Sequence, residues 1–133
     1  MRADAMGVTV RFLQQGRGVE IVAEGVVRGT EVLAANREIY EEPRLRRLRY
    51  QLIDKSACTE YALTANDIAA LAELDIQAAR INPDIVIAIV EAQGLQFSLT
   101  ELWQAHLRDC PILTRAFDSR DEAEAWIAGH AMP

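Results

Sequence analysis

The sequence predicts a single α/β domain with a roughly five-stranded, mostly parallel sheet and helices packed against it. Two strand-like segments open the chain, and helical and strand-like segments then alternate, in the order β-β-α-β-α-β-α-β-α. Strands that alternate with helices pair in parallel through right-handed crossovers. Residues 85–90 are apolar at six successive positions, which is typical of a strand covered by helices on both faces. A chain of 133 residues suits one such core.

The first two strands are expected to form an antiparallel hairpin. Residues 1–7 show no regular pattern and are expected to be a flexible leader, with one folded domain over residues 8–130. Apolar residues alternate with polar ones in the first predicted strand, at Val8, Val10 and Phe12. Residues 14–18 contain two glycines suited to a turn, and residues 19–27 predict the second strand.

A first helix is predicted to begin at residues 29–30 and to end before Pro43. Its buried stripe has helical spacing and consists of Val32, Ala35 and Ile39. Four arginines follow within residues 44–49. They either form ion pairs with the preceding glutamates on the surface or form a patch that binds an anion or a partner. The sequence leaves both interpretations open.

The third strand and the segment after it form the region from which function is expected. Residues 48–53 predict a buried strand, followed by a polar loop that begins at Asp54. Thr64 is the predicted N-cap of the next helix, and Asp67 stands three residues later, where its charge favours the helix dipole. Such loops usually hold the working residues of open α/β domains. The apolar face of this helix is predicted to consist of Ile68, Leu71, Leu74, Ala78 and Ile81.

The rest of the chain predicts two more strands and two more helices. Residues 84–90 form the apolar strand, and residues 98–101 are a capping box that starts a helix. Residues 112–117 predict the fifth strand, and residues 119–122 are a second capping box. The closing helix is predicted to have an inner face of Ala123, Trp126 and Ile127.

The composition argues against several classes of function. A net charge of -6 and a pI of about 4.9 disfavour broad binding to nucleic acids or anionic membranes, which requires a surplus of Lys and Arg. No apolar run in the sequence approaches the ~20 residues that a membrane span needs. Cys58 and Cys110, without a signal peptide, indicate reduced thiols, and we expect a cytoplasmic protein.

The sequence contains no recognisable catalytic or cofactor motif. It has no glycine-rich phosphate loop and no G-x-S-x-G elbow. His106 and His130 stand 24 residues apart and match no zinc-site motif, so neither a zinc site nor another cofactor is expected. Because an active site needs convergent titratable groups, we do not expect an enzyme.

The order of the predicted elements is similar to that of the STAS domain, the fold of the bacterial anti-sigma factor antagonists. Residues 52–56, Leu-Ile-Asp-Lys-Ser, look like the LDLS pattern with which a strand of this family ends. Thr64 follows ten residues after Asp54, at the first turn of the next helix. Residues 116–127 look like the ending of SpoIIAA-like and STAS/SEC14-type small bacterial proteins.

This resemblance implies a non-enzymatic signalling module that acts through protein–protein contacts. In the antagonists the position of Thr64 holds a serine or threonine that a partner kinase phosphorylates, so the resemblance implies a phosphorylation site and a kinase or anti-sigma-like partner. Residues 62–66, Ala-Leu-Thr-Ala-Asn, lack the acidic residue and the glycine that the antagonists carry there. SEC14-like relatives carry lipids or other hydrophobic small molecules between sheet and helix, and a carrier or sensor of that kind is the alternative function.

Both hypotheses lead to candidate site residues. The polar side chains expected to contact a partner or ligand are Asp54, Ser56, Thr59, Tyr61 and Asp67. Phe97 and Trp103 are expected to line an apolar pocket in the alternative, with residues 94–99 as a mobile lid. Each of these residues also has a plain structural interpretation as a cap, a loop residue or a core side chain. An exposed edge on the first strand could support a homodimer.

Overall fold

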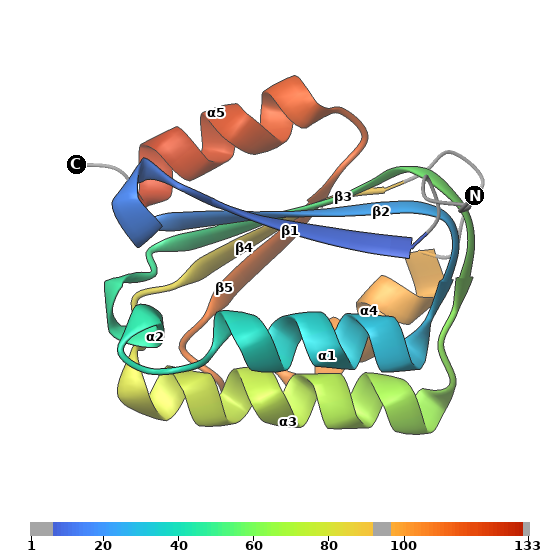
Figure 1. Cartoon of the computed structure of the whole chain (residues 1–133), viewed down its shortest axis with the longest axis horizontal. Helices are drawn as coiled ribbons and strands as arrows, with labels where there is room; N and C mark the ends of the chain where they lie inside the picture. Colours follow the sequence, from blue (N-terminus) through green and yellow to red (C-terminus); the bar gives the residue numbers. More distant parts are fainter. Residues whose placement is uncertain (1–6, 92–96, 132–133) are drawn as a thin grey trace, which may run out of the picture.

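The computed structural model describes residues 7–91 and 97–131, and these residues form one five-stranded sheet (Figure 1). The strands lie side by side in chain order: β1 (Gly7–Leu13), β2 (Gly18–Arg28), β3 (Tyr50–Ala62), β4 (Val86–Val90) and β5 (Leu113–Phe117). β1 pairs antiparallel with β2 across the short turn η1 (Gln14–Gly16), and the other pairs are parallel. The predicted α/β class, the mostly parallel sheet and the opening hairpin are confirmed.

Helices cover both faces of the sheet. One face carries α1 (Gly29–Ile39), α3 (Ala65–Ile81) and α4 (Phe97–His106), and the other carries α5 (Arg120–His130) (Figure 1). A four-residue helix, α2 (Arg44–Arg47), follows α1 and was not predicted, because it is too short to show a periodic stripe. Its Arg46 forms an ion pair with Glu42 at 2.6 Å, as expected if these arginines pair with the preceding glutamates.

β4 is buried on both faces, as its apolar run predicted. Ile87 and Ile89 belong to the larger core cluster, which also contains buried residues of α1, α3 and α4. Val86, Ala88 and Val90 belong to a second cluster that includes buried residues of α5. The strand therefore contributes alternate side chains to two separate cores.

The predicted N-caps of α3 and α5 are present. The Thr64 hydroxyl accepts a hydrogen bond from the Asp67 N–H at 3.1 Å, and the Asp67 carboxylate accepts one from the Thr64 N–H at 3.0 Å. Ser119 accepts a hydrogen bond from the Glu122 N–H at 3.2 Å. These bonds satisfy N–H groups that have no partner in a preceding turn.

The polar segment that follows Asp54 is a strand, not the predicted loop. β3 is 13 residues long, and its second half pairs with the end of β2 through two register shifts. The segment has few large apolar side chains, which is why its sequence resembles a loop. The long β2 nevertheless pairs its backbone, and Cys58 and Tyr61 still contribute to the core.

α1 ends at Ile39, before Pro43 as predicted, but one detail of α3 differs from the prediction. Ile81, expected on the apolar face of α3, is 40% exposed. The buried stripe of α3 is centred on Ala72 and Asp75, and helical geometry therefore places Ile81 at the margin of this stripe.

Candidate functional site

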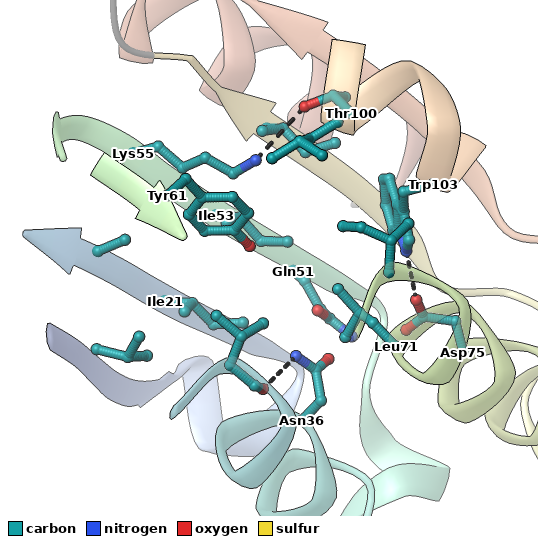
Figure 2. Close-up of a pocket in the computed structure, with 16 residues that line it drawn as sticks. Ile21, Asn36, Gln51, Ile53, Lys55, Tyr61, Leu71, Asp75, Thr100 and Trp103 are labelled. Carbon is teal, nitrogen blue, oxygen red and sulfur yellow. Dashed lines mark hydrogen bonds between the residues drawn. The ribbon is translucent and has the colours of Figure 1, made fainter. Parts of the chain in front are cut away.

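A cavity with mostly apolar walls lies between the sheet and the helices α1, α3 and α4 (Figure 2). Measured as the space open to the centre of a water-sized sphere, its volume is ≈ 40 Å³. One water needs roughly 10–15 Å³ on that measure, so the cavity suits a small molecule, and a lipid would require the helices to move apart. The apolar part of its wall includes Ile21, Ala23, Val32, Ile68, Leu71 and Leu99.

The alternation of β3 directs polar side chains to both faces of the sheet. Gln51, Ile53 and Lys55 line the cavity. Leu52 and Asp54 lie between them in sequence and point to the face that carries α5. A glutamine and a lysine therefore face a cavity whose other walls are mostly apolar.

A chain of hydrogen bonds connects this part of β3 to all three helices. Gln51 Nε2 donates to the Tyr40 hydroxyl at 2.6 Å, and that hydroxyl donates to Asp75 Oδ1 at 2.5 Å. Trp103 Nε1 donates to Asp75 Oδ2 at 2.8 Å (Figure 2). Tyr40 caps the end of α1, Asp75 belongs to α3 and Trp103 belongs to α4.

Asp75 is a buried carboxyl group, only 2% exposed. Burial raises the pKa of Asp75 to about 6, although the hydrogen bonds from Tyr40 and Trp103 favour its charged form. Burial and the nearby Asp75 charge raise the pKa of Tyr40 well above its ordinary value. Asp75 can therefore gain or lose a proton near neutral pH, whereas Tyr40 stays protonated.

Gln51 carries an unpaired oxygen atom. The residue is 0% exposed, and Oε1 is the one buried side-chain nitrogen or oxygen without a hydrogen-bond partner in the part of the chain that the structure describes. A buried acceptor without a partner costs about 1–3 kcal/mol. Gln51 is among the residues that line the cavity, and Figure 2 draws its side chain next to Asn36 and Leu71.

Another part of the cavity wall holds the sole lysine of the sequence, Lys55. Its ammonium lies 3.4 Å from the Thr100 hydroxyl and 4.1 Å from the centre of the Tyr61 ring (Figure 2). It also lies 3.8 Å from the Glu91 carboxylate. Thr100 in turn donates to Glu91. Burial lowers the pKa of Lys55, and the Glu91 charge opposes that effect. Lys55, Thr100 and the Tyr61 ring therefore form this part of the wall, and Lys55 is paired with the buried Glu91.

Asp54 belongs to an ionic network on the opposite face of the sheet. Its carboxylate accepts hydrogen bonds from the Ser56 N–H at 2.9 Å, from the Ser56 hydroxyl at 2.6 Å and from Arg120 at 3.2 Å. Arg120 also pairs with Glu20 on β2. Burial alone would raise the pKa of Asp54, but the bonds from Ser56 and Arg120 outweigh it and lower that pKa. The carboxylate is thus well supplied with donors from the protein.

The structure brings two of the predicted site residues to the cavity. Tyr61 and Trp103 both line it, Tyr61 from β3 and Trp103 from α4. The backbone of Phe97 begins α4, but its side chain lies outside the described residues, as does most of the predicted lid over residues 94–99.

The other predicted residues lie away from the cavity. Asp54 and Ser56 bind each other on the α5 face. Thr59 is exposed on β3, and Thr64 and Asp67 cap the start of α3, with Thr64 exposed. The expected contact surface is therefore divided between two faces of the sheet and one helix end.

Sequence reasoning did not single out the buried polar residues of the cavity wall: Asn36, Gln51, Lys55, Asp75 and Thr100. One signal could have found Asp75, because it stands seven residues after Ile68, on the apolar stripe of its helix. The sole lysine of the chain, set within a strand, is a second signal. A polar residue where the periodicity expects a core residue must find a buried partner.

The described part of the chain offers neither a metal site nor a membrane span. Within residues 7–91 and 97–131, no three His, Cys, Asp or Glu side chains are placed to hold a metal ion. No helix in these ranges has the length and apolar character needed to cross a membrane. Cys58 and Cys110 are free thiols, and burial raises the pKa of Cys58, which disfavours its reactive thiolate form.

A solved structure decides which fold this arrangement represents. The chain is similar to the crystal structure of an uncharacterised DUF3478-family protein from Shewanella loihica PV-4, which is described as having a SpoIIAA-like fold. The TM-score is 0.59, the sequence identity is 15%, and the match covers 95% of this chain and 98% of the other. The fold is SpoIIAA-like.

This result confirms the STAS-type resemblance at the level of the fold. At such low identity, the shared SpoIIAA-like fold carries no residue roles from one protein to the other. No protein-family model matches the chain, and no curated protein does.

Proposed function

We propose that this chain is a non-enzymatic regulatory module that binds a small, mainly apolar molecule in the cavity between the sheet and α1, α3 and α4. The observation that carries the proposal is the cavity itself, whose mostly apolar wall also holds a few polar side chains, Lys55 and Thr100 among them. Ligand pockets typically combine an apolar wall with a few polar groups that orient the ligand.

The state of the ionisable groups supports binding rather than catalysis. Both oxygens of Asp75 already accept hydrogen bonds, from Tyr40 and Trp103. The Lys55 ammonium faces Glu91 and Thr100. A general acid or base must reach the reacting atom of its substrate, whereas these groups are engaged by the protein itself.

Binding in this cavity offers a route to regulation. The chain from Gln51 through Tyr40 and Asp75 to Trp103 joins β3 to α1, α3 and α4. An occupant that contacts the walls therefore stabilises one relative position of three helices. A ligand shifts such an equilibrium by its difference in affinity for the two positions.

Toluene is a suitable first probe, because it is apolar and about the size of one ring. Saturable chemical-shift changes in the methyl groups of Ile21, Leu71 and Leu99, measured by NMR titration, are the expected result. Absence of a saturable change at these methyl groups would contradict the proposal. Native mass spectrometry of freshly purified protein gives a second reading, since a retained small molecule supports binding and a clean protein mass argues against it.

Ala23→Leu is the matched test of location, because Ala23 is buried on the cavity wall. The larger side chain fills the space, and toluene binding should be lost at a stability cost of about 1–3 kcal/mol. Ala34→Leu, at an exposed position of α1, should leave binding unchanged. Equal binding by the native protein and by A23L would place the toluene site elsewhere.

The second candidate function is a switch in which phosphorylation of Thr64 changes the contact with a regulatory partner, a kinase or an anti-sigma-like protein. Thr64 is exposed, and its hydroxyl accepts the Asp67 N–H at the start of α3. A phosphate would approach the Asp67 carboxylate, which itself packs against Gly29 of α1. The test is incubation with cell lysate and ATP, followed by mass spectrometry for one added phosphate on Thr64. An unmodified Thr64 across growth conditions would argue against the switch.

A further inference from the structure

The Lys55 ammonium differs from the other nitrogen donors of the cavity wall in the length of its bonds to the protein. Its contacts with Thr100 and Glu91 measure 3.4 and 3.8 Å, whereas an N–H···O hydrogen bond is normally about 2.7–3.2 Å long. The other side-chain nitrogens on the described wall bond to protein oxygens at 2.6 to 3.0 Å: those of Asn36, Gln51 and Trp103. An ammonium has three N–H groups, so Lys55 keeps donor capacity that these long contacts leave unused.

The Lys55 side chain is also placed to meet an occupant. It lines the cavity, and it is 11% exposed, so it is not sealed off by its neighbours. Its nitrogen end lies between Thr100 and the Tyr61 ring, and both of these line the same space (Figure 2). An occupant that touches Thr100 and the Tyr61 ring therefore comes within reach of the ammonium.

The hydrogen bonds behind Lys55 determine which kind of polar group fits beside it. The single hydrogen of the Thr100 hydroxyl goes to Glu91, so the Thr100 oxygen accepts from Lys55 and has no hydrogen left for a ligand. Glu91 is buried and paired with Lys55. Lys55 is thus the donor at this part of the wall, and the matching group of a ligand is an acceptor.

The charges favour an uncharged acceptor over an anion. Lys55 and Glu91 compensate each other in a buried place, so a carboxylate in the cavity would bring a negative charge without a cation of its own. Asp75 lines the same cavity, and its pKa of about 6 makes it mostly ionised at neutral pH, which disfavours a further anion. A carbonyl group supplies an acceptor oxygen without this penalty.

We propose that the occupant of the cavity is a small apolar molecule with one uncharged carbonyl oxygen, which accepts a hydrogen bond from Lys55 Nζ. The apolar part of the wall, including Ile53 and Leu99, holds the body of this molecule. This inference rests on the function proposed above, since it requires that the cavity binds a ligand, and it adds the chemical class of that ligand.

Acetophenone, α-methylstyrene and benzoate test the proposal, because each is a phenyl ring on a trigonal carbon and the three have nearly the same shape. Acetophenone carries a carbonyl oxygen on that carbon, α-methylstyrene carries a methylene group in its place, and benzoate carries a charged carboxylate. Their dissociation constants are measured by NMR titration of the full chain at neutral pH. Acetophenone should bind about tenfold more tightly than either of the other two.

The Lys55 side chain gives a second reading, because it is the sole lysine of the sequence. Isotope-labelled lysine therefore produces one side-chain signal, and its shift with pH reports the pKa of Lys55. Saturating acetophenone should raise this pKa, because the carbonyl oxygen stabilises the charged ammonium. Saturating α-methylstyrene should not raise it, since this molecule has no acceptor.

Variants identify the donor. Lys55→Met together with Glu91→Gln removes the ammonium without leaving a buried charge, so K55M/E91Q should bind acetophenone and α-methylstyrene equally. Thr100→Val should keep the preference for acetophenone, because the Thr100 hydrogen is held by Glu91. Arg37→Met, at an exposed position of α1, removes a cation elsewhere and should behave like the native protein.

The possible results decide between the two proposals. Equal affinity of the native protein for acetophenone and α-methylstyrene overturns this inference, whereas saturable toluene binding would still support the cavity as a binding site. Failure of toluene, acetophenone and α-methylstyrene to bind overturns both. Tighter binding of benzoate than of acetophenone rejects the uncharged class. A preference for acetophenone that persists in K55M/E91Q removes Lys55 from recognition, and the pKa of Lys55 in the native protein decides the same question if that variant does not fold.

Discussion

The guanidinium of Arg120, at the start of α5, lies 3.2 Å from the carboxylate of Asp54 on β3, although 66 residues separate them in the chain. The same guanidinium pairs with Glu20 on β2. Both carboxylates are largely buried, so each depends on this one cation for part of its charge compensation. The contact also fixes the first turn of α5 against two strands of the sheet.

Arg120→Met is expected to destabilise the protein, because it leaves Glu20 and Asp54 buried without their shared partner. We expect a loss of roughly 2 kcal/mol in the free energy of unfolding, below the value for a fully buried pair since Arg120 is partly exposed. Urea unfolding measures the change. Arg37→Met, at an exposed position, should cost less than about 0.5 kcal/mol, and an equal cost at both arginines would contradict the assigned role.

The cost of Arg120→Met should also depend on pH. The hydrogen bonds from Arg120 and Arg11 outweigh burial and lower the pKa of Glu20, and those from Ser56 and Arg120 do the same for Asp54. A lowered pKa means that this stabilisation is present above the unfolded pKa, near 4, and is lost as the pH falls through the folded value. The difference between the native protein and R120M should therefore shrink in acid.

Asp75 is expected to make the opposite contribution to stability. Its pKa is raised from 3.8 to about 6 by burial, so the folded protein binds a proton that the unfolded chain has already released. Stability contributed by this group is present below about pH 4 and is lost as the pH rises through about 6. Asp75→Asn cannot ionise, so the stability of D75N relative to the native protein should rise by roughly 3 kcal/mol between about pH 4 and about pH 7.

Urea unfolding at intervals across this range measures the gap between D75N and the native protein. Tyr40→Phe is the companion variant, because it removes the hydrogen bond that lowers the pKa of Asp75. Its pH-dependent loss of stability should extend to higher pH than in the native protein. A gap between D75N and the native protein that stays constant with pH would show that Asp75 does not titrate in this range.

Gly29 allows the starts of α1 and α3 to approach closely. A Cβ at Gly29 would lie 2.3 Å from Asp67 Oδ2 and 2.5 Å from Asp67 Cγ. Gly29→Ala should therefore cost about 1–3 kcal/mol, by displacing the carboxylate that caps α3. In the Asp67→Ala background the same change should cost far less, because the obstructing carboxylate is absent.

A double-mutant cycle by urea unfolding measures this coupling between Gly29 and Asp67. Gly129→Ala in α5 is the control, since a Cβ at Gly129 would have no atom of the described residues within 4 Å and alanine favours a helix. It should stabilise the protein by about 0.5–1 kcal/mol. Additive effects of G29A and D67A would contradict the proposed contact.

Lys55→Met is expected to be more harmful than the loss of the whole ion pair. The single change leaves the Glu91 carboxylate buried with Thr100 and without its cation, at a cost of roughly 3–5 kcal/mol. The double variant K55M/E91Q removes both charges and should recover much of that loss. Urea unfolding of the single and double variants provides the comparison, and a double variant less stable than K55M would reject the explanation.

Much of the fold could be predicted from the sequence, because the relevant signals are local. Apolar runs and alternation identified the strands, and the Thr64–Asp67 cap marked the start of α3. The second half of β3 was missed because its pairing depends on the length of β2, a distant segment. A polar strand and a polar loop look alike until the partner strand is known.

The sequence by itself determined the α/β class, the order of the elements and the burial of β4, since these depend on side-chain spacing of two to four residues. Only the tertiary structure decided that Gln51, Tyr40, Asp75 and Trp103 meet beside one cavity. Their hydrogen bonds join four separate elements, and distances of 2.5 to 2.8 Å depend on how three helices settle on the sheet. Local periodicity sets which side of a helix is buried, but packing alone selects the partner that each buried polar group finds.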